Sequence, residues 1–255
     1  MSYETLLYEI EGPIATVTLN LPQKYNTIRP PMPDELEAVM ARASKDAEVR
    51  VVVLQGAGST FCAGFDFSGN LEQYKDMGVA LNPEDYDPGL DVMAMTSPFT
   101  GPVPKFMSIW RNPKPVICKI HGWCVGGGSE MALCADIVVA ADDARLGTPY
   151  ARVWGCHLTG MWIYRLGLTK AKQYALTGDS VSGREAAEIG LINDSCPADE
   201  LDQRVAEWAG RLAKIPTTQL MAMKLVVNQA FDNMGLQTTQ YMGPILDGIM
   251  RNTPE

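Results

Sequence analysis

The sequence of 255 residues predicts an α/β fold that ends in a helical region. Short apolar runs typical of buried strands alternate with segments of helical spacing in the first part of the chain. Glycine-rich turns follow two of these strands, at residues 56–64 and 126–128. Later in the chain the apolar residues recur at helical spacing. We therefore expect one core over residues 1–195 and a helical region over residues 196–255.

The first predicted elements are a β-hairpin and a strand–helix–strand unit. The hairpin turns at Glu11-Gly12-Pro13, between two apolar runs. A helix begins near Pro33, and its Leu36, Val39 and Met40 recur on one face. The predicted strands are residues 6–10, 14–19, 51–54, 116–120 and 137–140.

The segment of residues 67–103 has no sustained period of either kind. It is rich in Gly, Pro, Asp and Met, and it leads into the helix-like residues 105–110. Long irregular segments are either functional lids or disordered, and the sequence leaves both possibilities open. Further on, Ser182 and Glu185 fit a capping box. The helices expected after that point are residues 198–214, 217–233 and 237–250.

Charge and cysteine usage argue against several classes of protein. The formal net charge of −9 disfavours nonspecific binding to nucleic acid or to an anionic membrane, because both need clustered Lys and Arg. The six cysteines stand mostly in apolar runs, which favours reduced core residues. The N-terminus lacks the features of a secretory signal, and no apolar run reaches membrane-spanning length. We expect a cytoplasmic protein.

Residues 121–130, with the sequence His-Gly-Trp-Cys-Val-Gly-Gly-Gly-Ser-Glu, form the most informative segment. A strand runs into a triple-glycine turn there, and a helix begins. Glycines let the backbone approach a bound atom, and the N–H groups at a helix start attract negative charge. A second glycine turn follows the strand at residues 51–54. Two strand ends that both offer N–H donors can stabilise an enolate, so we expect an oxyanion hole.

Two motifs in these turns resemble a known family. Residues 61–66, Phe-Cys-Ala-Gly-Phe-Asp, together with residues 126–130, Gly-Gly-Gly-Ser-Glu, resemble the crotonase superfamily, whose enoyl-CoA hydratases and isomerases act on acyl-CoA thioesters. The resemblance implies the crotonase spiral of repeated ββα units with a C-terminal helical region. Further likenesses to the family, which extend over nearly the whole chain, are residues 21–26, 176–179, 186–192 and 223–224.

The resemblance implies roles for residues in both turns. The backbone N–H groups of Phe65 and Gly127 match the oxyanion donors, which contribute about 3 kcal/mol each in comparable sites. Glu130 matches the glutamate that handles water in the hydratases; its alternative role is to complement the helix N-terminus. The residues expected to bind CoA or the acyl group are Lys24, Ala63, Asp66, Gly126, Trp154, His157 and Lys224.

The chain departs from the family where the hydratases carry a second glutamate, because Tyr150 stands there. Hydration needs one group to position the water and another to exchange a proton with carbon. Tyr150 either donates a proton or shapes the acyl pocket, since a phenol with a pKa near 10 is a poor base at neutral pH. Nearby, Trp154, His157 and Trp162 stand in place of the usual Gly- and Pro-rich run. His157 is a candidate proton carrier, with a structural role as the alternative.

Three other motifs do not hold. A zinc interpretation is invited by Cys118, His121, Cys124 and Cys134. No Cys-x-x-Cys pair occurs, however, and alternation along a strand explains the spacing. Residues 56–61 begin like a dinucleotide fingerprint but lack its last glycine. No Gly-x-Ser-x-Gly elbow is present. We expect neither a metal nor a redox cofactor, with CoA entering only as part of the substrate.

The leading hypothesis is an enoyl-CoA hydratase, which adds water reversibly to a 2-enoyl-CoA. The alternatives are an enoyl-CoA isomerase or C–C bond hydrolase of the same fold, and a paralogue that binds acyl-CoA without turnover. We expect no nucleic-acid or membrane partner. Apolar residues of the last two helices indicate a homo-oligomer, which the resemblance makes a trimer or a dimer of trimers. This helical region is also expected to cover the active site.

Overall fold

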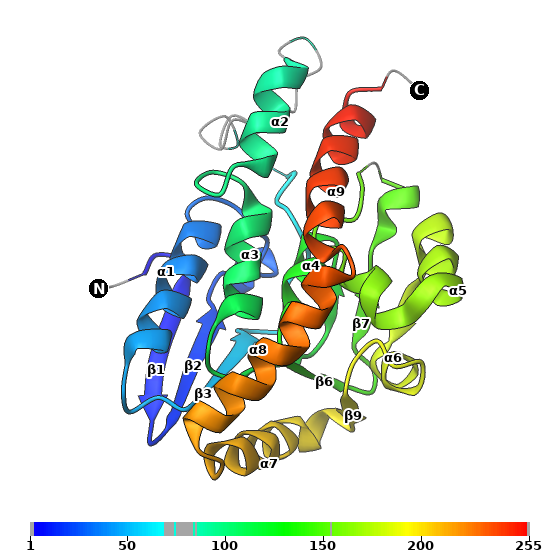
Figure 1. The fold of residues 1–255 in the computed structure, drawn as a ribbon. Coiled ribbons are helices and arrows are strands. Elements are labelled where there is room, and N and C mark those ends of the chain that lie inside the picture. The colour runs from blue at the N-terminus through cyan, green and yellow to red at the C-terminus, as the bar shows by residue number, and fades with distance from the viewer. Residues whose placement is uncertain (1–2, 69–73, 75–83, 85, 154, 254–255) are drawn as a thin grey trace.

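Two sheets form the centre of the part of the molecule that the computed structural model describes, residues 3–68, 74, 84, 86–153 and 155–253 (Figure 1). In the larger sheet, ordered β1-β2-β3-β4-β6-β9, β1 is antiparallel to β2 and the other neighbours are parallel. Its strands are β1 (Leu6–Glu11), β2 (Ile14–Leu19), β3 (Val51–Gly56), β4 (Val116–Ile120), β6 (Ile137–Ala141) and β9 (Asp194–Cys196). The smaller sheet contains β5 (Trp123–Val125), β7 (Arg145–Gly147) and β8 (Ser180–Ser182).

The central strands of the larger sheet are buried on both faces. Consecutive residues of β3 and β4 alternate between the two faces, yet nearly all of them are buried. Such strands read as continuous apolar runs, which explains why the sequence predicts them well. Around the sheet, α1 (Met32–Lys45) packs on α3 (Pro102–Arg111), and α7 (Leu201–Ala213) packs against β3, β4 and β6.

One element contradicts the expectation of an irregular segment over residues 67–103. Helix α2 (Pro88–Thr96) lies within it, so the prediction is wrong for those residues. Asp87 caps the helix, because its carboxylate accepts hydrogen bonds from the N–H groups of Gly89 at 2.8 Å and Leu90 at 3.0 Å. Residues 69–73, 75–83 and 85 lie outside the described residues, and so does the question of lid or disorder for them.

Several elements were not predicted from the sequence. Strands β5, β7, β8 and β9 have three residues each, which is too short to establish a period. Helix α5 (Met161–Thr177), which contains a non-helical Gly167, was not predicted either. Helix α6 (Gly183–Glu188) begins as the capping box predicts, with Ser182 Oγ accepting from the Glu185 N–H at 3.1 Å.

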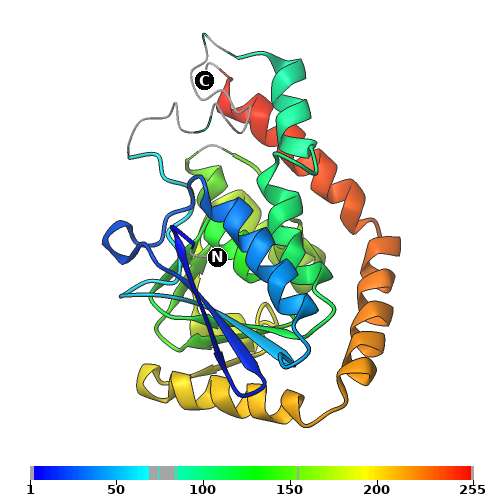
Figure 2. The ribbon, with the colours of Figure 1, turned by 90° about the vertical axis from the view of Figure 1, so that its left-hand side faces the viewer.

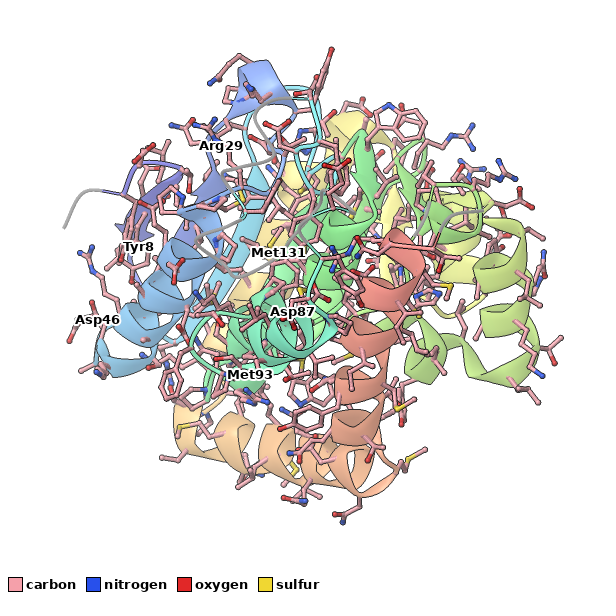
Figure 3. The ribbon with its side chains drawn as sticks, turned by 90° about the horizontal axis from the view of Figure 1, so that it is seen from above. Tyr8, Arg29, Asp46, Asp87, Met93 and Met131 are labelled. Carbon is pink, nitrogen blue, oxygen red and sulfur yellow. The ribbon has the colours of Figure 1, made fainter. Side chains whose placement is uncertain are left out.

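The chain after β9 is helical, and its last helix packs against a helix from the first half of the sequence. Helices α7, α8 (Thr217–Asn233) and α9 (Leu236–Arg251) follow one another around one side of the molecule in Figure 2. Helix α9 packs against α2, as both ribbon views and the view from above show, where Asp87 and Met93 mark α2 (Figure 3). In the described residues, no helix combines the length and the apolar character needed to span a membrane. The division at residue 195 falls within β9 and stays a prediction.

Candidate active site

The two glycine turns predicted to form an oxyanion hole are in direct contact. The backbone of Cys62, in the first turn, pairs with that of Cys124 in an isolated parallel β-bridge, so the first turn lies beside the strand that precedes the second. A Cβ built on Gly64 would lie 3.1 Å from the carbonyl oxygen of Val125 and 3.7 Å from the nitrogen of Gly127. Gly64 also has a φ of +89°, which disfavours any other residue there.

The backbone N–H groups of Phe65 and Gly127 have no hydrogen-bond acceptor among the described residues. Their neighbours are held firmly: the Gly126 N–H donates to the Gly147 carbonyl at 2.8 Å, and Trp162 Nε1 donates to Ser129 Oγ at 3.0 Å. Ser129 Oγ in turn lies 2.9 Å from the Gly126 carbonyl oxygen. Two unused donors on a fixed backbone are what stabilisation of a carbonyl oxygen requires.

A cavity of about 490 Å³ lies beside these two amides. This volume is in the range of small-molecule sites, and its wall is mostly apolar. The wall contains both glycine turns together with side chains from distant parts of the chain. Among the predicted site residues, those that line the cavity are Ala63, Phe65, Gly126, Gly127 and Tyr150.

Glu130 lies behind this wall and is fully buried. One carboxylate oxygen is 3.1 Å from His157 Nδ1, and the other accepts from the Thr159 N–H at 2.9 Å and from the Thr159 hydroxyl. Burial alone would raise the pKa of Glu130, but the hydrogen bonds from His157 and Thr159 outweigh it and lower the pKa. An ionised carboxylate only accepts hydrogen bonds, so His157 Nδ1 carries the proton of this pair.

Tyr150 lines the cavity and packs against the Glu130–His157 pair. Its ring meets the His157 ring edge-on, with the centroids 5.7 Å apart. Its hydroxyl is shielded from solvent and has no hydrogen-bond partner in the described part of the chain. Burial, followed by the negative charges of Glu130 and Asp247, raises its pKa well above 10.0. Tyr150 is therefore a neutral phenol at physiological pH and not a base.

Two of the residues predicted to bind CoA pair with each other. The half-exposed Lys24 places Nζ 3.4 Å from a carboxylate oxygen of the buried Asp66. Hydrogen bonds from Ser68, helped by Lys24, lower the pKa of Asp66. The Tyr74 hydroxyl lies 2.9 Å from the Asp66 carbonyl oxygen, and Tyr74 itself lines the cavity. This arrangement links the first glycine turn to a cationic side chain.

The structure does not bring Lys224 to the cavity. Its Nζ is nearly buried and donates to the Asp136 carboxylate at 2.7 Å, with the carbonyl oxygens of Ile109 and Lys114 at 3.4 and 3.3 Å. Desolvation lowers the pKa of Lys224 and raises that of Asp136, and the ion pair opposes both shifts. Trp154, also predicted to bind substrate, lies outside the described residues.

The sequence missed the charged residues of the cavity wall. Asp247 and Arg251 line the cavity from α9, and the Arg251 Nε donates to Asp247 at 2.8 Å. Their spacing of four residues was a signal for an ion pair on one helix face, but nothing indicated where that face would lie. Thr159 was missed as well, because a lone threonine has no pattern that marks it as a partner of Glu130.

Comparisons with known proteins identify the family of the chain. The family model described as enoyl-CoA hydratase/isomerase matches residues 9–243. A probable enoyl-CoA hydratase of Rhodobacter capsulatus is 30% identical over 91% of this chain and 84% of its own length. The 1,2-epoxyphenylacetyl-CoA isomerase of Escherichia coli is 29% identical over 90% and 84%. The crystal structure of an enoyl-CoA hydratase from Mycobacterium smegmatis is 39% identical, with a TM-score of 0.92 and coverage of 100% and 87%.

The family match covers most of the chain, and the solved structure superposes over all of it. The sequence resemblance and the predicted fold are thereby confirmed. This chain belongs to the enoyl-CoA hydratase/isomerase family of the crotonase superfamily and has the crotonase fold.

Proposed function

We propose that this protein is an enoyl-CoA hydratase, which adds water reversibly across the double bond of a 2-enoyl-CoA. The observation that supports this proposal best is the pair of unused amides of Phe65 and Gly127 beside a cavity. When the thioester carbonyl oxygen accepts hydrogen bonds from both amides, the conjugated β-carbon of the enoyl group becomes more electron-poor. The same two donors then stabilise the enolate that forms when water adds.

The Glu130–His157 pair is the proposed proton carrier. Because Nδ1 of His157 donates to Glu130, a neutral His157 presents an unprotonated Nε2. His157 does not itself line the cavity, so the proposal requires its Nε2 to reach the water beside Tyr150. In the forward direction this nitrogen takes a proton from the attacking water, whose oxygen bonds to the β-carbon. The imidazolium then returns a proton to the α-carbon, so one water is consumed. Glu130 stabilises the imidazolium, and the Tyr150 ring fixes the orientation of His157.

The test is the absorbance of the enoyl-thioester band with crotonyl-CoA and a longer enoyl-CoA. The wild-type protein should remove the band, and Glu130→Gln should lower kcat/KM by about a hundredfold or more. Glu185→Gln is the matched control, because this glutamate also stands in the first turn of a helix and accepts a hydrogen bond, from the Tyr174 hydroxyl at 3.0 Å. An unchanged band with the wild-type protein, or full activity of Glu130→Gln, would refute the proposal.

Tyr150 favours a second candidate, an enoyl-CoA isomerase. With a neutral phenol at the position of the second carboxylate, the Glu130–His157 pair is the acid–base centre, and one centre suffices to move a proton between two carbons. A 3-enoyl-CoA would then gain the conjugated band, while a 2-enoyl-CoA would keep it. A C–C bond hydrolase of the same fold would instead release a shortened acyl product.

The position of Glu130 behind the cavity wall favours a third candidate, a protein that binds acyl-CoA without turnover. Tight binding of crotonyl-CoA with no change in any substrate would support it. Tyr150→Glu separates the candidates further. A gain of hydratase activity on restoring the second carboxylate would favour the isomerase or the binder over a native hydratase.

We also propose that the chain forms a homo-oligomer through α8. No residue of α8 is fully buried, and Leu225 and Val226 are both 67% exposed. A helix with this much exposed apolar surface fits a subunit interface. Leu225→Glu with Val226→Glu should reduce the mass measured by light scattering toward that of one chain of 27.8 kDa. A wild-type protein that already has this mass would refute the proposal.

A further inference from the structure

We infer that the part of the cavity beside Asp247 and Arg251 receives the acyl chain and selects one that bears a hydroxyl group. This inference rests on the proposed function only in taking an acyl-CoA thioester as the ligand. It names a chemical class for the acyl group. The observation behind it is the charged pair Asp247 and Arg251 in a wall that is otherwise mostly apolar.

The charged pair is part of a buried network that joins α9 to α2. Arg251 donates from Nε to Asp247 at 2.8 Å and from Nη2 to Asp91 at 3.0 Å. The Cys156 N–H donates to the other Asp247 oxygen at 3.0 Å. Asp91 is 1% exposed and Asp247 is 8% exposed, so the surroundings are largely dry. Asp91 does not line the cavity, whereas Asp247 and Arg251 do.

A purely aliphatic chain is a poor fit for this end of the cavity. It would exclude water from Asp247 and give that carboxylate no hydrogen bond in return. Sites with buried polar groups discriminate against a ligand that lacks the matching polar group. The residue pair therefore selects a polar acyl group over an apolar one of the same length.

The chemistry of Asp247 favours a hydrogen-bond donor in the ligand. Each carboxylate oxygen accepts one described hydrogen bond and can accept a second. Burial, opposed by Arg251, raises the pKa of Asp247, and a further donor would stabilise its ionised form. A ligand carboxylate would instead be repelled by Asp247 and Asp91. A neutral hydroxyl supplies the donor without this repulsion.

The experiment measures calorimetric binding of saturated CoA esters, which does not depend on turnover. The probes are hexanoyl-CoA, its 4-, 5- and 6-hydroxy derivatives, and adipoyl-CoA, which ends in a carboxylate. At least one hydroxylated ester should bind the wild-type protein about tenfold more tightly than hexanoyl-CoA, and adipoyl-CoA should bind more weakly than that ester.

Three variants identify the source of the preference. Asp247→Leu should bring the ratio of hydroxylated to plain ester close to one, and Asp247→Asn, which keeps an acceptor for the Cys156 N–H, should reduce it to about threefold or less. Asp91→Asn alters the same network without touching the cavity and should keep the preference. If Asp91→Asn lost the preference for the hydroxylated ester as fully as Asp247→Leu, the network would act only through the docking of α9 on α2, and the inference would be overturned.

Other outcomes are equally decisive. Equal affinity for hexanoyl-CoA and every hydroxylated ester overturns the inference, and so does tightest binding of adipoyl-CoA, which would indicate capture of a carboxylate by Arg251. Failure of every CoA ester to bind overturns the inference and the proposed function together. A hydroxyl preference in binding, without hydration of any enoyl-CoA, supports the inference and refutes only the proposed reaction.

Discussion

The two sides of the cavity are built in different ways. The oxyanion side consists of backbone amides from two glycine turns that contact each other directly. The opposite side consists of side chains from η4 (Pro149–Ala151), the loop before α5, and α9, and it departs from the family pattern at Tyr150. The difference teaches that, in the proposed mechanism, stabilisation of the thioester and handling of the proton are separable: the first needs glycines, and the second needs particular side chains to meet.

The largest expected effect tests the oxyanion side. Gly64→Ala adds a Cβ at a φ of +89°, 3.1 Å from the Val125 carbonyl oxygen, and should displace the Phe65 amide. Loss of one oxyanion donor should lower kcat/KM by about a thousandfold. Gly190→Ala is the matched control, because its φ is +80° and no atom lies within 4 Å of the added Cβ. Comparable losses of activity in both variants would mean that strain alone explains the effect.

The next effect tests the proton side. His157→Gln keeps a donor for Glu130 but removes the imidazole, so kcat/KM should fall by about a hundredfold. A variant that keeps the wild-type kcat/KM would assign His157 a structural role only.

A smaller effect concerns the stability that Glu130 contributes. Its hydrogen bonds from His157 and Thr159 favour the ionised form, so Glu130→Gln should lower the free energy of unfolding at pH 7 by about 1.5–3 kcal/mol. Because the pKa of Glu130 is lowered in the folded state, this contribution is present above the ordinary value of 4.5 and is lost as pH falls through the folded pKa. Urea unfolding at pH 7 and pH 3.5 measures it. A difference in the free energy of unfolding between the wild-type protein and Glu130→Gln that does not shrink toward low pH contradicts the lowered pKa of Glu130.

The smallest effect asks whether a charged side chain extends the oxyanion side toward CoA. Lys24 is 43% exposed beside Asp66, and Lys24→Ala should raise KM for an acyl-CoA about threefold, an effect that high salt should weaken. Lys224→Met should leave KM unchanged but lower the melting temperature, since it leaves the largely buried Asp136 without its cation. The opposite pattern would favour Lys224 as the residue that binds CoA.

Much of the fold was predictable because its signals are local. The buried strands β3 and β4 are continuous apolar runs, and the helix at Thr217–Asn233 has the predicted bounds. Helix α2 was missed because the composition around it is rich in Gly and Pro, although Asp87 followed by Pro88 is a helix-start signal. Strands of three residues were missed because pairing with neighbours, and not their own pattern, defines them.

By itself the sequence determined the fold class, the family and the backbone of the oxyanion side. Glycines at fixed positions after two strands specify where amides are left unpaired, and this information is local. Only the tertiary structure decided that Glu130 is held by His157 and Thr159, that Lys224 is buried with Asp136, and that α9 brings Asp247 into the cavity wall. Each of these contacts joins residues far apart in the chain. They depend on how helices and loops pack, which periodicity and propensity do not specify.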